Sequence, residues 1–153
     1  MATPLNCRIE LLDWETAKPR AWPLRLAVFV HEQRVPEELE HDEWDARSLH
    51  ALASDERGRV LGTARLLPDG HIGRMAVAAA ARGRGVGSVL LQSLLAAAAR
   101  RGHTEVQLHA QVSAQPFYAR HGFEAIGAPF MEAGIEHRTM RRPVKANAHS
   151  TGI

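Results

Sequence analysis

A glycine-rich run at residues 82–88 constrains this chain more than any other feature, because it joins two segments of different periodicity. Residues 71–77 before it form a short apolar block after a Pro-Asp-Gly turn, which predicts a strand. Residues 85–101 after it carry apolar side chains every three or four positions, which predicts an amphipathic helix. A strand that passes through glycines into a helix N-terminus is typical of an anion-binding loop, since the first-turn N–H groups lack acceptors within the helix.

The residues of this run favour a phosphate or pyrophosphate as the anion. Glycines alternate with other residues from 83 to 87, so a ligand can approach the backbone closely, and Arg82 and Arg84 add positive charge. The alternative is a turn that only tightens the packing of strand against helix. Two nucleotide-binding motifs do not fit, because the Rossmann fingerprint requires a third glycine where Ser88 stands and the Walker A loop requires a lysine that this run lacks.

A single domain accounts for the size and composition of the chain. Its 153 residues are 45% apolar, 24% charged and 5% aromatic, which suits one hydrophobic core. We expect the domain to span residues 5–143 and residues 144–153 to form a flexible C-terminal tail. Nineteen Lys and Arg against seventeen Asp and Glu give a net charge of +2, so the charge balance does not indicate a nucleic-acid partner.

The chain is expected to be soluble and cytoplasmic. Its longest uncharged run, residues 85–99, is shorter than the roughly 20 residues of a membrane-spanning helix, so no membrane partner is expected. Charged residues throughout the first thirty positions argue against a signal peptide. The single cysteine, Cys7, cannot form an internal disulfide and is expected to be buried as a small apolar residue.

The order of the predicted elements is that of an α+β domain. A helix is expected after Pro23, ended by Pro36, and the acidic segment 37–45 is expected to be a loop or one helical turn. Gly102 follows the long helix and stops it. The full prediction is β-α-α-β-β-β-α-β-α-β-β, in which the second α is the possible turn within 37–45. The strands are expected at 6–12, 50–54, 60–67, 71–77, 105–110, 123–128 and 137–142, and the other helices at 24–30, 85–101 and 114–121.

Two motifs together resemble the GNAT superfamily of N-acetyltransferases. One is R-x-x-G-x-G from Arg82 to Gly87, which resembles the acetyl-CoA pyrophosphate loop of that family. The other is F-Y-x-x-x-G-F from Phe117 to Phe123, about thirty residues downstream. The resemblance covers about residues 5–143. Residues 29–36 and 134–140 also resemble one bacterial branch of the family, whose substrates are mostly unassigned.

This resemblance implies a fold, a reaction and a set of site residues. The fold is a mixed, twisted sheet with helices on both faces, whose strands ending near Val77 and Ala110 splay apart to admit the cofactor. The reaction is direct transfer of an acetyl group from acetyl-CoA to an amine of a small molecule or peptide. Tyr118 protonates the leaving sulfur, unless it is only a core aromatic residue. The implied cofactor-binding residues are Met75, Ala76, Val77, Arg82, Gly83, Arg84, Gly85, Val86, Gly87 and Ser88.

The general base is less constrained. Six of the nine residues from 37 to 45 are acidic, so this segment is a candidate for attracting a cationic amine, with Glu38, Asp42 and Asp45 as candidate bases. The alternative is a solvated acidic face. His109 and His137 are candidates for relaying a proton, the alternative being structural hydrogen-bonded histidines. The nine histidines lack the spacing of a metal-ligand motif, so no metal site is predicted.

Two other classes of function remain open from the sequence. One is a non-catalytic acyl-CoA-binding regulator that uses the same glycine-rich loop. The other is a partner-binding module whose acidic segment 37–45 docks on a basic protein surface. Self-association into a homodimer is compatible with each of these functions.

Overall fold

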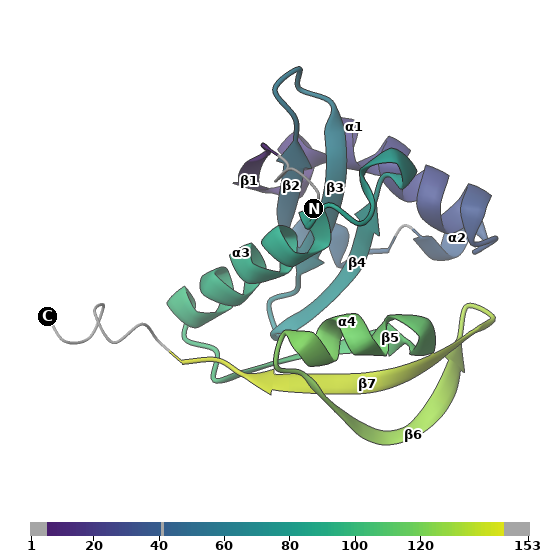
Figure 1. Ribbon diagram of the computed structural model, residues 1–153, viewed down its shortest axis with the longest axis vertical. Coiled ribbons are helices and arrows are strands. Elements are labelled where there is room, and N and C mark those ends of the chain that lie inside the picture. Colours follow the sequence, from purple (N-terminus) through teal and green to yellow (C-terminus); the bar gives the residue numbers. More distant parts are fainter. Residues whose placement is uncertain (1–5, 41, 146–153) are drawn as a thin grey trace, which may run out of the picture.

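The computed structural model describes residues 6–40 and 42–145, and it confirms the predicted α+β fold class and element order (Figure 1). The expected domain start at residue 5 and the tail residues 146–153 lie outside the described residues. The elements are β1 (Arg8–Leu12), α1 (Trp14–Arg25), α2 (Glu37–Glu40), β2 (Leu49–Ser54), β3 (Val60–Leu66), β4 (His71–Val77), α3 (Val86–Arg100), β5 (Glu105–Gln111), α4 (Gln115–Arg120), β6 (Glu124–Glu132) and β7 (Ile135–Pro143).

The seven strands form one sheet in the order β1-β2-β3-β4-β5-β7-β6. All neighbouring pairs are antiparallel except β4 and β5, which run parallel and pair only at His71 with Gln107 and Ile72 with Leu108. Beyond those pairs the two strands diverge, and Figure 1 shows β5, β7 and β6 turning away from the other half of the sheet. The expected splay between the strands that end near Val77 and Ala110 is therefore confirmed.

Helices cover both faces of the sheet, as expected. Successive strand side chains point to opposite faces. In β2, Leu52 packs with Trp14, Ala17 and Ala21 of α1, whereas Ala51 and Ala53 pack in the cluster that contains the buried leucines of α3. The alternation along β2 thus places α1 and α3 on opposite faces. α4 lies on the α3 face, because its Phe117 and Tyr118 pack against the same cluster.

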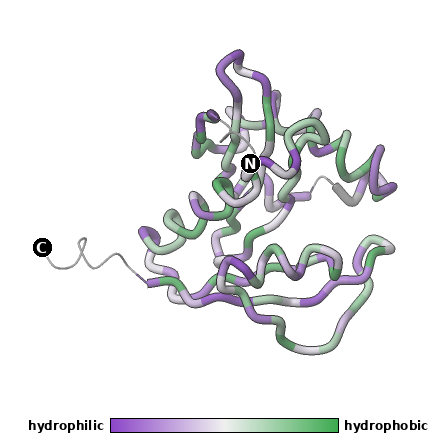
Figure 2. Tube along the Cα trace, viewed as in Figure 1, coloured by the Kyte–Doolittle hydropathy of each residue, from purple (hydrophilic) through white to green (hydrophobic). Residues whose placement is uncertain are grey.

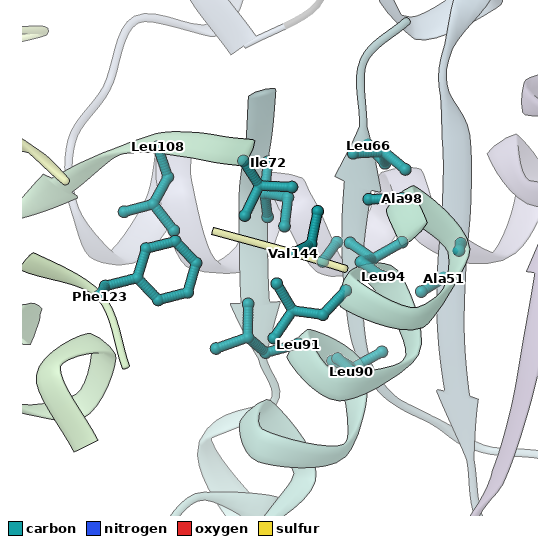
Figure 3. Close-up of a cluster of buried hydrophobic side chains, with 14 of the residues drawn as sticks. Ala51, Leu66, Ile72, Leu90, Leu91, Leu94, Ala98, Leu108, Phe123 and Val144 are labelled. Carbon is teal, nitrogen blue, oxygen red and sulfur yellow. The ribbon is translucent and has the colours of Figure 1, made fainter. Parts of the chain in front are cut away.

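The larger core lies between α3 and the sheet, and it extends further along the chain than the sequence predicts (Figure 3). Hydrophobic residues recur along the length of α3, whereas the β2–β3 turn is hydrophilic (Figure 2). Val144 was expected to begin the flexible tail. Instead its side chain is 6% exposed, and its N–H donates to the carbonyl of Thr104 at 2.9 Å. Apolar contact and one backbone hydrogen bond thus hold residue 144 against the core.

The first helix begins ten residues earlier than predicted. α1 starts at Trp14, where the Asp13 carboxylate accepts the N–H of Thr16 at 2.9 Å as a cap, and it contains both Pro19 and Pro23. Both prolines are exposed, so water can reach the carbonyls that they leave without a donor. After α1 the chain continues as a π-helix over Leu26–Glu32. The acidic segment, expected to be a loop or one helical turn, forms one helical turn in α2.

Candidate active site at the splay of β4 and β5

The glycine-rich loop has the conformation that an anion-binding cradle requires. Gly83 and Gly85 have φ angles of 75° and 87°, in the left-handed region that favours glycine. A Cβ atom added at either residue would meet nothing within 4 Å, so the space beside both is open. α3 begins directly afterwards at Val86, and no side chain caps its N-terminus. Its first-turn N–H groups can therefore donate to a phosphate.

Gly87 and Ser88 serve mainly to pack α3 against α4. A Cβ atom on Gly87 would lie 3.4 Å from the Phe117 ring and 3.8 Å from the Met75 sulfur, so this glycine allows close helix packing. The Ser88 hydroxyl lies 2.9 Å from Nε2 of His121 at the end of α4. These two residues join the cradle to the segment that carries the second sequence motif.

Arg82 was expected to add positive charge to the cradle, and in the structure its guanidinium is hydrogen-bonded to other residues. Its Nη1 and Nη2 atoms each donate to the Glu32 carboxylate at 2.7 Å, and its Nε donates to the carbonyl of Val77 at 3.1 Å. Arg82 thereby ties the loop to the end of the π-helix. The hydrogen bonds from Arg82 lower the pKa of Glu32. Arg84 is exposed beside the two left-handed glycines.

Tyr118 lies at the splay. Its hydroxyl is 4.0 Å from the sulfur of Met75, which belongs to the part of β4 that has separated from β5. The ring is held edge-on against Phe117 and Phe123, at centroid distances of 5.0 and 5.8 Å. Burial raises the pKa of Tyr118 to about 12, so the phenol is protonated throughout the neutral range.

β4 bends at the same place. Thr63 of β3 faces Ala76 and Arg65 faces Gly73, so β4 holds one residue more than β3 over this stretch and forms a bulge. Arg74 within the bulge has a φ of 49°, which is unusual for a residue with a side chain. Met75 belongs to the bulge, and together with Ala76 and Val77 it forms the edge of β4 that does not pair with β5 at the splay.

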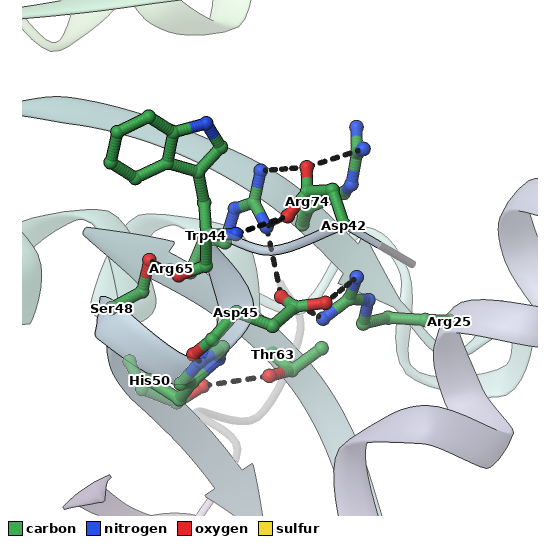
Figure 4. A network of polar contacts seen from close by, with 10 residues as sticks. Arg25, Asp42, Trp44, Asp45, Ser48, His50, Thr63, Arg65 and Arg74 are labelled. Carbon is green, nitrogen blue, oxygen red and sulfur yellow. Dashed lines mark hydrogen bonds and ion pairs between the residues drawn. The ribbon is translucent and has the colours of Figure 1, made fainter. Parts of the chain in front are cut away.

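A buried chain of ion pairs fixes the loop before β2 onto the sheet (Figure 4). Arg25 of α1 donates to both carboxylate oxygens of Asp45, at 2.9 and 3.1 Å, and these two side chains are 1% and 0% exposed. Arg65 of β3 donates to Asp45 at 2.8 Å and to both oxygens of Asp42 at 2.7 and 2.9 Å. Asp42 also accepts from Arg74 at 3.2 Å.

This network argues against Asp42 and Asp45 as general bases. Burial alone would raise the pKa of Asp42, but the hydrogen bonds and charge of Arg65 and the charge of Arg74 lower it to about 2. Burial likewise opposes, and Arg25 and Arg65 produce, the lowered pKa of Asp45. A carboxylate whose pKa is lowered by arginine partners is a weaker base than an ordinary carboxylate. Both residues are ion-pair partners within the fold, which disfavours a role as the base, and the assignment of Asp42 or Asp45 as the base stays a prediction.

Glu38 lies elsewhere. It is exposed on α2 and lines a surface groove of about 550 Å³ with Lys18, Trp22 and Glu37. None of the residues that line this groove belongs to the cradle or to the splay. Glu38 thus lies on the surface beside a second acidic residue, and no described contact joins it to Tyr118.

The two histidine candidates belong to a cluster on β5, β6 and β7. Nδ1 of His109 lies 2.9 Å from the Glu132 carboxylate, and Nε2 of His137 lies 3.8 Å from its other oxygen. The Phe130 ring contacts the rings of both histidines. Sequence reasoning missed Phe130 and Glu132, because only the register of the β6–β7 hairpin brings Phe130 opposite His137 and Glu132 opposite Ile135. The motif over residues 134–140 was the available signal.

Two further observations concern the part of the chain that the structure describes. Residues 6–40 and 42–145 contain no group of three His, Cys, Asp or Glu side chains arranged to hold a metal ion. No helix among them is long and apolar enough to cross a membrane. Cys7 is free and half-buried rather than fully buried as expected.

Comparison with known proteins agrees with this geometry. The model of an acetyltransferase (GNAT) domain matches residues 15–143. YjcF of Bacillus subtilis, an uncharacterised N-acetyltransferase, is 36% identical over 125 residues that cover 80% of this chain and 89% of YjcF. YyaT, an uncharacterised protein of the same organism, is 31% identical over 145 residues, which cover 91% of this chain and 97% of YyaT.

Solved structures give the same result. An acyl-CoA N-acyltransferase from Pseudomonas aeruginosa superposes with a TM-score of 0.80 and 33% identity, over 90% of this chain and 99% of that one. ElaA from Escherichia coli superposes with a TM-score of 0.80 and 29% identity over the same shares of the two chains.

Proposed function

Because this chain belongs to the GNAT family of acetyltransferases, we propose that it transfers an acetyl group from acetyl-CoA directly to an amine of a small molecule or peptide. The observation that carries this proposal is the meeting of three features at one opening. The first is the splay of β4 and β5. The second is the N-terminus of α3, which follows two left-handed glycines and has no side-chain cap. The third is the Tyr118 hydroxyl, which lies beside Met75 of β4.

The residues present fit coenzyme A. The open space beside Gly83 and Gly85, together with the first-turn N–H groups of α3 and the exposed Arg84, suits a pyrophosphate. When bound, acetyl-CoA supplies the activated acetyl group as a thioester. The backbone N–H groups at Met75, Ala76 and Val77 are the proposed donors to the thioester oxygen, and Tyr118 is the proposed donor to the sulfur as it leaves. No covalent intermediate on the protein is required.

Two structural observations favour this function over the alternatives. A partner-binding module would use free negative charge on the acidic segment 37–45, and the commitment of Asp42 and Asp45 to internal ion pairs leaves less of it than the sequence indicates. A non-catalytic acyl-CoA sensor would need no proton donor at the splay, whereas the hydroxyl of Tyr118 lies there. We expect the acceptor to be cationic in solution and the protein to work in the cytoplasm.

The test is coenzyme A binding by calorimetry, followed by acetyl transfer to a panel of amines with thiol release and acetylated product as readouts. Gly85→Glu places bulk and negative charge in the cradle and should weaken binding at least 100-fold. Gly58→Glu is the matched control, because Gly58 in the β2–β3 turn also has a positive φ, of 79°, and also has nothing within 4 Å of an added Cβ. Equal affinity in the two folded variants would refute the cradle. Binding without acetyl transfer to any amine would favour the sensor.

A further inference from the structure

Amine acetylation requires a base that the ion-pair network does not provide. An ammonium must lose a proton before its nitrogen can attack a carbonyl, and the Asp42 and Asp45 carboxylates are held in their charged form by arginines. A base for this reaction should lie beside the splay, carry a free lone pair and be reachable from solvent. Among the described residues, the His109–Glu132 pair combines these properties.

The hydrogen bond between His109 and Glu132 fixes the orientation of the imidazole. Nδ1 lies 2.9 Å from the Glu132 carboxylate, which only accepts, so Nδ1 must carry the proton and the lone pair of the neutral ring lies on Nε2. Both side chains are accessible, at 43% and 45% exposed. A carboxylate that orients a histidine in this way also stabilises the imidazolium that forms when Nε2 takes up a proton.

His109 is the first residue of β5 beyond the last pair with β4, which is Leu108 with Ile72. It therefore lies where the splay begins. Leu108 and Ala110 point into the core on the α3 and α4 face, so His109 and Gln111 point to the other face. There the Gln111 amide donates to Gln33, which follows the π-helix, at 2.9 Å. His109 and Tyr118 thus approach the opening from opposite faces of the sheet.

The surroundings of His109 suit a positively charged amine. The Glu132 carboxylate supplies negative charge, and the Phe130 ring lies edge-on to His109 at 5.1 Å and parallel to His137 at 6.0 Å. A carboxylate beside aromatic faces is a common way to bind an ammonium group. His137 donates through Nδ1 to the carbonyl of Ile135 at 2.7 Å, which leaves its Nε2 facing Glu132.

The charged groups that face this cluster come from three strands. β6 contributes Glu132 and β7 contributes His137. β4 contributes His71, whose ring lies 6.2 Å from that of His109 and whose Nδ1 is 3.0 Å from Asp69. Arg74 of β4 is directed to Asp42. Glu132 is the only one of these groups in hydrogen-bond contact with His109 among the described residues.

We propose that His109, oriented by Glu132, is the general base that deprotonates the acceptor ammonium, and that Glu132 and Phe130 form the subsite that binds it. This inference rests on the proposed acetyl transfer. The ammonium gives one proton to Nε2, and the neutral nitrogen then attacks the thioester carbon. The C–N bond forms and the C–S bond breaks. The sulfur leaves as a thiolate that accepts a hydrogen bond from Tyr118 and then takes a proton from water. The nitrogen loses its second proton to solvent, and His109 releases its proton to water.

The experiment uses His109→Gln and acceptors that differ in pKa. Without a base the enzyme must use the neutral amine, which at pH 7 is about one molecule in 2,500 for a lysine ε-amine and about one in ten for a peptide α-amine. Nα-acetyl-lysine amide and tri-alanine carry one such amine each. The loss in kcat/KM should approach 10³-fold for the first and stay below about tenfold for the second. For either acceptor, the loss should shrink as the pH is raised towards the pKa of the amine.

Controls separate this inference from a structural effect and from the proposed function. Glu132→Gln should give the same trend with a smaller loss, and Glu136→Gln, on the exposed side of the same hairpin, should change nothing. In the parent protein, ¹⁵N NMR of the neutral imidazole should find the His109 proton on Nδ1 and lose that preference in Glu132→Gln. A loss that is equal for all acceptors and pH values, or a proton on Nε2, would overturn the inference. A parent enzyme that binds coenzyme A but acetylates no amine would instead overturn the proposed function.

Discussion

Tyr118→Phe separates chemistry from packing at the splay. The substitution keeps the aromatic ring and its edge-on contacts with Phe117 and Phe123, and it deletes only the hydroxyl. The contact of that hydroxyl is with the sulfur of Met75 at 4.0 Å, and a thioether is a weak acceptor. We therefore expect the free energy of unfolding to change by less than about 0.5 kcal/mol and the affinity for coenzyme A to stay within about twofold.

The size of the catalytic loss follows from the acidity of the phenol. A donor with a pKa of about 12 is a weaker acid than a thiol, for which the ordinary pKa is about 8.5. Complete transfer of the proton to sulfur is then uphill by about 5 kcal/mol. Tyr118 should act mainly by a charge-assisted hydrogen bond to the departing sulfur, which contributes about 1.5–3 kcal/mol. The corresponding loss in kcat is about 10- to 100-fold.

The assay is steady-state thiol release on the amine that the parent turns over fastest, from pH 6 to pH 10. Because the phenol stays protonated across this range, the parent and the variant should have pH profiles of the same shape, with the variant lower at every point. A variant that matches the parent rate would show that the phenol is structural. A variant that loses coenzyme A affinity or several kcal/mol of stability would refute the view that packing does not depend on the hydroxyl.

Three further outcomes follow from the ion pairs. Asp45→Asn leaves the buried Arg25 charge uncompensated and should lower the free energy of unfolding by about 3–5 kcal/mol in urea titrations, whereas Glu124→Gln, in the exposed pair with Arg141, should cost less than about 1 kcal/mol. The folded pKa of Asp42, about 2, lies below its unfolded value near 3.8. Asp42 therefore contributes about 2 kcal/mol at most to the free energy of unfolding above about pH 4, and this contribution is lost as the pH falls towards 2. Asp42→Asn should flatten the dependence of the free energy of unfolding on pH over this range. Arg82→Ala removes the hydrogen bonds that hold the cradle loop to Glu32 and Val77, so it should weaken coenzyme A binding about tenfold by calorimetry. Glu32→Gln weakens the same tie and should lower the affinity less.

The sequence was most informative where local backbone chemistry decides the structure. Left-handed glycines, the turn at residues 68–70 and the periodicity of α3 are local signals, and each predicted its element within one or two residues. The two short motifs also predicted which segments meet, because Gly87 of the first packs against Phe117 of the second. These features determine the cradle and the splay, so the position of the candidate site could be predicted.

Long-range pairing was not predictable in the same way. The two exposed prolines of α1 predict a break in the helix. The packing of Trp14, Ala17 and Ala21 against Leu52 holds the helix together despite them, and the sequence does not indicate this packing. The pairing of Arg82 with Glu32 joins residues fifty positions apart and depends on the π-helix, which no pattern in the sequence indicates. The sequence therefore predicts that Arg82 adds positive charge at the cradle but does not predict its pairing with Glu32.

The acidic segment shows that charge density alone does not identify a general base. Asp42 and Asp45 are brought to Arg65 and Arg74 by the packing of their loop on β3 and the bulge of β4, so their charge is neutralised inside the fold and stabilises the free edge of β4. Glu132 is one of three acids in the β6–β7 hairpin, and it faces two histidines and no arginine in its described contacts. A carboxylate that must meet a cationic amine has to lie where the fold supplies no competing cation. By that criterion the proposed acceptor amine approaches the opening from the side of β5, β6 and β7. The other half of the sheet, β1 to β4, then positions the edge of β4 that faces this side.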